Sequence, residues 1–339
     1  MRTLDWVDGA IEMIDQTKLP QETETLRVDN IADLVAAIKR LSVRGAPALG
    51  VAGGYGVALA AQLYNPSQDR AAFDSAVHDI RTARPTAVNL ATMVDRVTAL
   101  AIVDPSAALP EAHKIRDEEI AASIQMGELG ADLVEELVQE LAGRTTGPTI
   151  RAMTICNTGG LAAVERGTAL AVVQTLHERQ RLAEALPVET RPLLQGGRLT
   201  TWELQRMGAP FRLLVDSAGP FMLARGAADV VLIGADRVAA NGDAANKIGS
   251  FSLALGAAHA GVPFIVVAPE STVDMQTASG DDIEIEDRGA EEVAAVRGTP
   301  IAPPGTAALN PAFDVTPVGL ITALVTDRRV VRFDRGEKL

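Results

Sequence analysis

The second half of the chain alternates short apolar runs with stretches of helical spacing, and this pattern most limits the folds open to it. The apolar, β-rich runs lie at 149–155, 212–215, 230–233 and 264–268, with weaker ones at 187–189 and 330–333. Strands that are apolar throughout and alternate with helices are typical of a parallel sheet covered on both faces. The sequence therefore predicts an α/β fold for this half.

The first 145 residues show mainly helical patterns. Asn30 is a helix-capping residue, and the apolar positions after it recur at helical spacing in 31–38, as they do in 48–64, 87–103 and 118–141. Residues 142–148 are rich in helix breakers. We therefore expect a domain boundary there, with a mostly helical N-terminal domain over 1–145 and an α/β domain over 146–339.

The net charge limits the possible partners. The chain has 31 Lys and Arg against 44 Asp and Glu, a formal charge of −13. Such a surface repels nucleic-acid phosphates and anionic lipids, so we expect neither nucleic acid nor membrane as a partner. The uncharged stretches 45–68 and 248–269 are long enough to span a membrane, but glycine and proline interrupt both. With one cysteine and no signal-peptide pattern, the sequence predicts a cytoplasmic protein.

Polar residues follow the predicted strands at their carboxyl ends. These positions hold Cys156-Asn157-Thr158-Gly159, Glu189-Thr190-Arg191-Pro192 with Gln195 close behind, Asp216-Ser217, and Asp236-Arg237. Ligands of open parallel sheets bind beyond the carboxyl ends of the strands. The sequence therefore predicts an active or binding site at this edge.

Two of these residues have competing interpretations. Cys156 is either a small buried hydrophobe or a thiol made reactive by a nearby helix N-terminus, because Asn-Thr-Gly and then a stretch of helical spacing follow it. Asp236 ends a strongly apolar strand, where partial loss of water would suit it to acid–base chemistry. Alternatively, Asp236 caps a helix or pairs with Arg237.

Three cationic positions are compatible with phosphate binding. Asn246 and Lys247 lie in a glycine-containing turn that enters a predicted helix, where backbone amides favour anions, although Lys247 could simply offset Asp243. Arg44, with Gly45 and Ala46, joins a cation to a tight turn that opens a helix. Arg84 follows a helix and could be an ordinary C-terminal charge.

Metal and nucleotide cofactors are not indicated. The four histidines lack metal-ligand spacing with one another, with Cys156 or with a carboxylate. Neither a Gly-x-Gly-x-x-Gly motif after a strand nor a phosphate loop ending in Gly-Lys-Ser/Thr occurs. We therefore expect no cofactor.

Motifs in fixed order over nearly the whole chain resemble those of the methylthioribose-1-phosphate isomerases, which share a superfamily with the alpha, beta and delta subunits of initiation factor 2B. The matching stretches are 14–20, 43–50, 84–90, 156–159, 189–192, 195–200, 234–243, 246–249 and 310–317. The resemblance implies a mostly helical N-terminal domain followed by a Rossmann-like parallel-sheet domain, a homodimer, and an aldose–ketose isomerisation in methionine salvage without a cofactor.

The resemblance also implies roles for individual residues. Cys156 and Asp236 would be the catalytic pair, and the residues that hold the phosphorylated sugar would be Arg44, Gly45, Ala46, Arg84, Gln195, Asn246 and Lys247. At three places the sequence differs from the residues usual in that family: Ile155 replaces a common His, Ala83 replaces a common Thr, and Ala-Gly-Pro follows Asp216-Ser217 in place of Met-Ala. These differences concern binding of the part of the sugar away from the phosphate.

Two alternatives stay open beside this interpretation. One is a sister isomerase of 5-deoxyribose 1-phosphate or ribose 1,5-bisphosphate, which would differ in what it recognises at C5. The other is a non-catalytic regulatory subunit of the initiation factor 2B type. Retention of both Cys156 and Asp236 favours an enzyme, since a scaffold needs neither.

Overall fold

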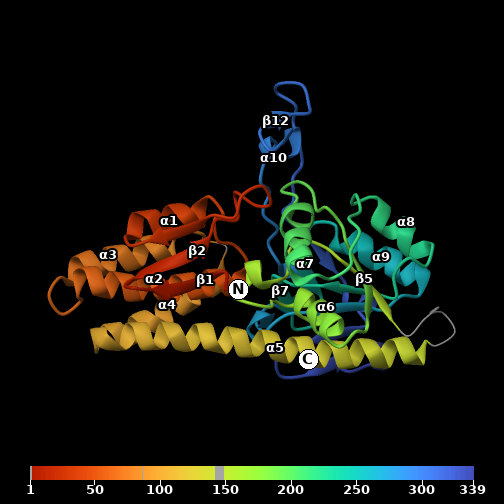
Figure 1. The fold of residues 1–339 in the computed structure, drawn as a ribbon, viewed down its shortest axis with the longest axis horizontal. Coiled ribbons are helices and arrows are strands. Elements are labelled where there is room, and N and C mark those ends of the chain that lie inside the picture. The colour runs from red at the N-terminus through yellow and green to blue at the C-terminus, as the bar shows by residue number, and fades with distance from the viewer. Residues whose placement is uncertain (1, 86, 142–148) are drawn as a thin grey trace. The chain divides into compact units, whose positions relative to one another are not determined.

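The computed structural model describes residues 2–85, 87–141 and 149–339, which form a mixed α/β fold with a parallel sheet (Figure 1). They divide into two compact units. Unit 1 comprises Met1–Ser123 and Gly159–Gly167, and unit 2 comprises Ile124–Thr158 and Thr168–Leu339. The breaker-rich stretch 142–148, where the sequence predicts a boundary, lies outside the described residues, so that boundary stays a prediction.

Unit 1 combines helices with a small antiparallel sheet. The sheet has the order β1 (Leu4–Val7), β2 (Ala10–Ile14) and β3 (Thr25–Val28). The helices are α1 (Ile31–Lys39), α2 (Ala46–Tyr64), α3 (Arg70–Arg81), α4 (Val88–Ala101) and α5 (Ala108–Glu140), the last continuing into unit 2. Asn30 caps α1 as expected, because its side chain accepts a hydrogen bond from Asp33 N at 2.9 Å. The sheet was not expected, since its strands are only four or five residues long.

Helix α2 explains the first long uncharged stretch. It is long and apolar enough to cross a membrane, yet 78% of its most apolar window is buried inside the structure. Fourteen of its nineteen residues are buried. Such a helix needs no charged face, because neighbouring elements of unit 1 cover it on most sides.

The main sheet of unit 2 has six strands in the order β15-β14-β9-β6-β4-β5. Their bounds are β4 (Ile150–Thr154), β5 (Leu182–Pro187), β6 (Val230–Ile233), β9 (Phe264–Val267), β14 (Ala323–Val325) and β15 (Val330–Arg332). All neighbouring strands are parallel except β14 and β15. The helices are α6 (Ala169–Glu178), α7 (Thr201–Met207), α8 (Ala218–Ala224) and α9 (Ser250–Ala260), of which α8 and α9 pack side by side (Figure 1).

Smaller elements extend unit 2. A second sheet has the order β10 (Val273–Asp274), β7 (Arg237–Ala239), β8 (Ala244–Lys247) and β13 (Phe313–Thr316). Helix α10 (Glu291–Ala294) precedes the hairpin of β11 (Ala295–Val296) and β12 (Thr299–Pro300). Single helical turns of unit 2 lie at Glu270–Thr272, Gly280–Asp282, Val318–Leu320 and Phe333–Arg335, with a π-helical turn at Gly196–Thr200. Two further single turns, Pro105–Ala107 and Gly160–Ala162, belong to unit 1.

The strand predictions hold where the apolar run is buried. Strands β4, β6, β9 and β15 lie at or within one residue or two of their predicted bounds. The prediction of a strand at 212–215 is wrong: this segment forms only isolated bridges beside β5, and Leu213 and Val215 are exposed. Of the run predicted at 187–189, only Pro187 lies in a strand, as the last residue of β5, which begins at Leu182.

Candidate active site

Cys156 lies at the carboxyl end of β4 and is fixed by hydrogen bonds on both of its peptide groups. Its N–H donates to Thr190 Oγ1 at 2.8 Å, and its carbonyl accepts from Thr200 Oγ1 at 2.7 Å. The backbone of Cys156 is left-handed, with φ of 63°, and the residue is buried. After Asn157-Thr158-Gly159, where we expect a helix to begin, the structure has a single helical turn at Gly160–Ala162, and the α-helix α6 begins only at Ala169.

Thr190 and Asp216 lie beside Cys156 from the two segments next along the sheet edge. The N–H groups of Thr190 and Arg191 donate to the two oxygens of Asp216, each at 2.7 Å. Thr190 is fully buried and also has a left-handed backbone, with φ of 66°. The predicted meeting of polar residues at these strand ends is thus seen for Cys156, Thr190 and Asp216.

Gln195 follows this turn and offers an unused polar atom. It is only 4% exposed, and its Oε1 is buried without a hydrogen-bond partner among the residues described. A buried amide oxygen without a partner carries a desolvation cost, which a ligand hydroxyl would remove. This observation fits Gln195 to a ligand-binding role.

Asp236 lies between β6 and β7, and its surroundings differ from the expectation. The prediction that its carboxylate is partly desolvated is wrong for this structure, because the residue is exposed. Its N–H donates to Ala245 O at 2.9 Å, which places it beside β8. Arg237 has an ion pair with Asp274, at 3.5 Å, so the structure gives that cation a partner other than Asp236.

Asn246 and Lys247 end strand β8, two residues before α9. Asn246 is buried, and its Nδ2 donates to Ser250 Oγ at 2.8 Å. The Nζ of Lys247 donates to Ala312 O at 2.8 Å and lies 4.2 Å from the centroid of the Phe313 ring. Asp243, suggested above as a counter-charge for Lys247, instead accepts hydrogen bonds from Asn241, Gly280 and Val318.

Asp314 accepts hydrogen bonds from two backbone amides at the start of α9, next to the turn where the sequence predicts a phosphate. Its two oxygens accept from Gly249 N at 2.7 Å and Phe251 N at 3.1 Å, at the start of α9. Burial raises the pKa of Asp314 to about 6, although these hydrogen bonds and the charge of Lys247 act in the opposite direction. Two amides at the start of α9 thus already have a carboxylate acceptor, and binding of a phosphate by Lys247 and the other amides of the turn stays a prediction.

The remaining predicted binding residues belong to unit 1. Gly45 directly precedes α2 with φ of 88°, between Arg44 and Ala46. A Cβ at Gly45 would lie 2.2 Å from Ala162 O, so only glycine fits this turn against the 159–167 segment. Arg84 follows α3 and is half-buried. Thr86 of the same motif lies outside the described residues.

The 159–167 segment is bound into unit 1 at several points. Thr3 donates from its N–H to Val164 O at 2.8 Å and from its hydroxyl to Gly160 O. Gln16 Nε2 donates to Leu161 O at 2.7 Å, and Arg2 pairs with Glu165 at 2.8 Å. In unit 2, Thr168 N donates to Thr158 O at 2.8 Å, so the chain leaves and re-enters that unit at one place.

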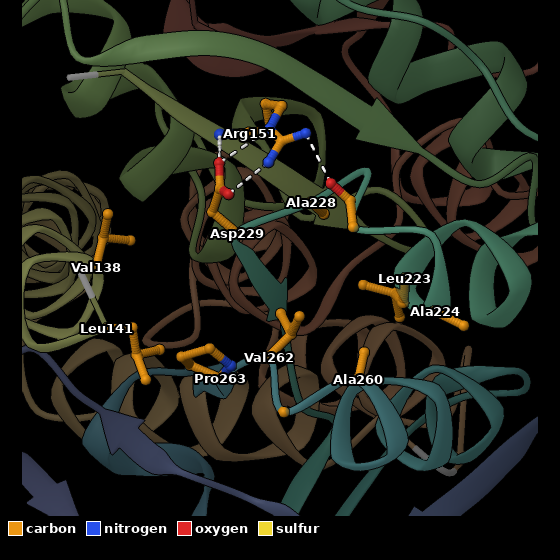
Figure 2. A pocket seen from close by; sticks show the side chains of 12 residues that line it. Val138, Leu141, Arg151, Leu223, Ala224, Ala228, Asp229, Ala260, Val262 and Pro263 are labelled. Atoms are coloured by element: carbon orange, nitrogen blue, oxygen red, sulfur yellow. Dashed lines mark hydrogen bonds and ion pairs between the residues drawn. The ribbon is translucent and has the colours of Figure 1, made fainter. Parts of the chain in front are cut away.

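A separate cavity of about 160 Å³ lies at the opposite, amino-terminal edge of the main sheet (Figure 2). Asp229 pairs there with Arg151, which also donates to Gly226 O, each at 2.7 Å. Because these charged groups already have partners and the remaining lining is mostly apolar, we do not assign the catalytic site to this cavity. Within the described ranges, no three His, Cys, Asp or Glu side chains are grouped so as to hold a metal ion.

Comparison with known proteins gives consistent matches over the whole chain. The sequence model of the initiation factor 2 subunit family matches residues 42–332. A methylthioribose-1-phosphate isomerase from Pelotomaculum thermopropionicum is 42% identical over 99% of this chain and 93% of its own length. A probable bifunctional methylthioribose-1-phosphate isomerase/methylthioribulose-1-phosphate dehydratase from Nocardia farcinica is 48% identical over 97% of this chain. The chain spans only 59% of that relative's length.

Two solved structures are similar to this chain over nearly its whole length. The 5-methylthioribose 1-phosphate isomerase from Pyrococcus horikoshii has a TM-score of 0.89 and 38% identity, over 98% of this chain and 92% of that one. A protein described as translation initiation factor eIF-2B, subunit delta, from A. fulgidus has a TM-score of 0.83 and 37% identity, over 98% and 96% of the two chains.

Proposed function

This chain belongs to the initiation factor 2 subunit family, and on that premise we propose that it is an aldose–ketose isomerase that converts 5-methylthioribose 1-phosphate to 5-methylthioribulose 1-phosphate in methionine salvage. The observation that carries the proposal is the similarity to isomerases of about the same length over nearly the whole chain. The dehydratase activity named for the longer relative is not part of the proposal.

The proposed reaction begins with opening of the sugar ring. Because the anomeric oxygen of this substrate is esterified to phosphate, the ring cannot open as a free sugar does, and an acid must protonate the ring oxygen. We assign this role to Asp236. Since Asp236 is exposed, we propose that the bound sugar covers its carboxylate, because removal of water favours the protonated form.

Hydrogen then moves from C2 to C1. Cys156, buried at the end of β4, either exchanges this proton through a cis-enediol or bounds a dry space for an internal hydride shift. Reaction in deuterated water separates the two routes, because solvent deuterium at C1 of the product excludes a pure hydride shift.

The substrate-binding assignments form part of the same proposal. Lys247, Arg44 and Arg84 supply positive charge for the phosphate, and Asn246, Gly45 and Ala46 supply further polar groups. Gln195 supports this assignment most directly, since its buried Oε1 has no partner in the described structure. We assign Gln195 to a sugar hydroxyl, because a carboxamide oxygen accepts a hydrogen bond from a hydroxyl but not from a phosphate dianion.

Phosphorus NMR of the purified protein with methylthioribose 1-phosphate, without added metal, tests the activity. We expect the resonance of the anomeric phosphate to be replaced by that of a ketose 1-phosphate ester. A control isomerase from the same family runs in parallel. If the control converts the sugar and this protein does not, the proposed substrate is wrong.

Two other candidates are decided by the same assay. The departures at Ile155, Ala83 and Ala218 bear on the part of the sugar away from the phosphate, so 5-deoxyribose 1-phosphate and ribose 1,5-bisphosphate are tested as competing substrates. Similarity to the subunit delta structure supports a regulatory, non-catalytic alternative. Inactivity on all three sugars would favour that alternative.

The organisation of the protein completes the proposal. We propose a mostly helical N-terminal domain over 1–145, a Rossmann-like domain over 146–339, and a homodimer that works in the cytoplasm without a metal or organic cofactor. Sedimentation of the purified protein, with and without chelator and over a range of concentrations, tests the assembly and its independence from metal.

A further inference from the structure

We propose that Thr190, anchored by Asp216, is a positioning residue that holds Cys156 in the orientation its reaction requires. The proposal rests on the catalytic role proposed for Cys156. It concerns how the fold keeps one side chain in an unusual place, and it adds no contact with the substrate.

The first argument is the backbone of Cys156 itself. Its φ of 63° lies in the left-handed region, which residues with a side chain seldom adopt. The conformation is held from both sides, by Thr190 Oγ1 on the N–H and Thr200 Oγ1 on the carbonyl. A peptide held in this way aims the Cys156 side chain differently from an ordinary extended strand end.

The second argument is that Thr190 is itself strained and closely confined. A β-branched residue at φ of 66° is a rare outlier, and such strain persists where neighbouring groups impose it, often at functional sites. Asp216 accepts the N–H groups of Thr190 and Arg191, both at 2.7 Å. A Cβ at Gly196 would lie 1.8 Å from Val188 O and 2.9 Å from Thr190 Oγ1, so the chain passes tightly against the threonine.

The third argument is the use of the Thr190 hydroxyl. It donates its hydrogen to Val188 O at 3.0 Å, which leaves its oxygen to accept the Cys156 N–H. Loss of this oxygen would leave a buried N–H without an acceptor, and the peptide before the thiol would shift to find one. The hydroxyl thus connects the anchored turn at Asp216 to the orientation of Cys156.

The test compares Thr190→Val, which keeps the branched shape but removes the oxygen, with Thr190→Ser, which keeps the oxygen. Two readouts are measured: isomerase kinetics and the rate at which iodoacetamide alkylates the thiol. Because Cys156 is the single cysteine of the chain, alkylation reports on it alone, whether or not the protein isomerises the proposed sugar. Failure of this inference is therefore distinguishable from failure of the proposed function.

For Thr190→Val we expect kcat to fall about tenfold or more with KM nearly unchanged, because the buried N–H loses its acceptor. We expect alkylation to accelerate, because the buried thiol is released, and Thr190→Ser to restore both values. Thr322→Val is the matched control: Thr322 Oγ1 likewise accepts a backbone N–H, from Phe264 at 3.0 Å, at the opposite edge of the sheet.

The control should lose stability without changing either readout. Unchanged alkylation and kcat in Thr190→Val would overturn the proposal, and so would equal effects in Thr190→Val and Thr322→Val. If the native protein lacks isomerase activity, the alkylation rates of the three variants decide the matter alone.

Discussion

At the scale of single residues, the proposed chemistry depends on one thiol and one carboxyl. We expect Cys156→Ala and Asp236→Asn each to lower kcat by about 100- to 10,000-fold, the usual contribution of a general acid or base. Neither change removes a phosphate contact, so calorimetry should show substrate binding near normal. A variant that retains most of its turnover would remove that residue from the mechanism.

Lys247 should behave differently from the catalytic pair. In the proposed site, Lys247 offers its charge to a phosphate that is present in both the substrate and the transition state, so Lys247→Ala should raise KM more than it lowers kcat. Lys39, an exposed residue in the last turn of α1, provides a matched control, and Lys39→Ala should change neither constant. A loss confined to kcat in Lys247→Ala would contradict the assignment.

Some features of the site could be predicted from residue types and others could not. Polar residues at the ends of parallel strands predict a meeting place, and Cys156, Thr190 and Asp216 do meet there. The capture of the α9 amides by Asp314 could not be foreseen, because β13 brings that carboxylate from 65 positions along the chain. The exposure of Asp236 could not be predicted either, because the apolar sequence of a strand does not determine how buried the loop after it is.

At the scale of secondary structure, substitutions at two adjacent glycines of α2, Gly53 and Gly54, allow the effect of helix propensity on stability to be measured apart from the effect of packing. A Cβ at Gly54 would make ordinary contacts, at 3.4 Å from Ile115 Cδ1 and 3.5 Å from Val97 Cγ2. Gly54→Ala should therefore stabilise the protein by up to about 1 kcal/mol, the gain of alanine over glycine in a helix. A Cβ at Gly53 would lie 2.8 Å from Leu90 Cδ1 and 2.9 Å from Val94 Cγ2.

Gly53→Ala should therefore be less stable than Gly54→Ala by about 1–3 kcal/mol, the usual cost of overpacking. Urea unfolding of both variants measures this difference, and the shared propensity gain cancels between them. Equal stabilisation by the two substitutions would mean that α4 yields to the added methyl group, and that the close approach of these helices is not what requires glycine at position 53.

The elements predicted well from sequence are those whose pattern is long or fully apolar. Helix α2 and strands β6 and β9 are examples, because nearly every position in them is buried. The three-residue strand β14 could not be recognised, because its hydrogen bonds to β9, a strand far away in the sequence, create it. The strands of the N-terminal sheet were missed because each has only four or five residues. Residues 212–215 show the opposite kind of miss: their apolar run predicts a strand, but it forms only isolated bridges beside β5, and two of its apolar side chains are exposed.

At the scale of the whole molecule, the buried carboxyl of Asp314 makes folding depend on pH. Its pKa of about 6 in the folded state exceeds the ordinary value of 3.8, so folding favours the protonated form. The resulting stability is fully present below pH 3.8 and is lost as pH rises through about 6. Relative to Asp314→Asn, the native protein should thus gain up to about 3 kcal/mol between pH 7 and pH 4.

The opposite dependence comes from Asp5 in unit 1. Burial by itself would raise the pKa of Asp5, but hydrogen bonds from Arg2, Arg116 and the Trp6 amide lower it to about 2. Its contribution to stability is present above pH 3.8 and is lost as pH falls through about 2. Urea unfolding at several pH values measures both effects. A native-minus-variant difference for Asp314→Asn that is flat between pH 4 and 7 would contradict the first.

Residues 159–167 belong to unit 1 although the chain on both sides of them belongs to unit 2, and this limits how segments of related genes can be exchanged. A gene fragment that ends after codon 123 would encode unit 1 without the nine residues to which Thr3, Gln16 and Gly45 are fitted. Exchange of unit 1 between two relatives would need junctions after 123, before 159 and after 167, so a single crossover cannot transfer it. The two units are therefore expected to be inherited together, and chimaeras should retain stability only when the nine-residue segment comes from the same parent as the N-terminal helices.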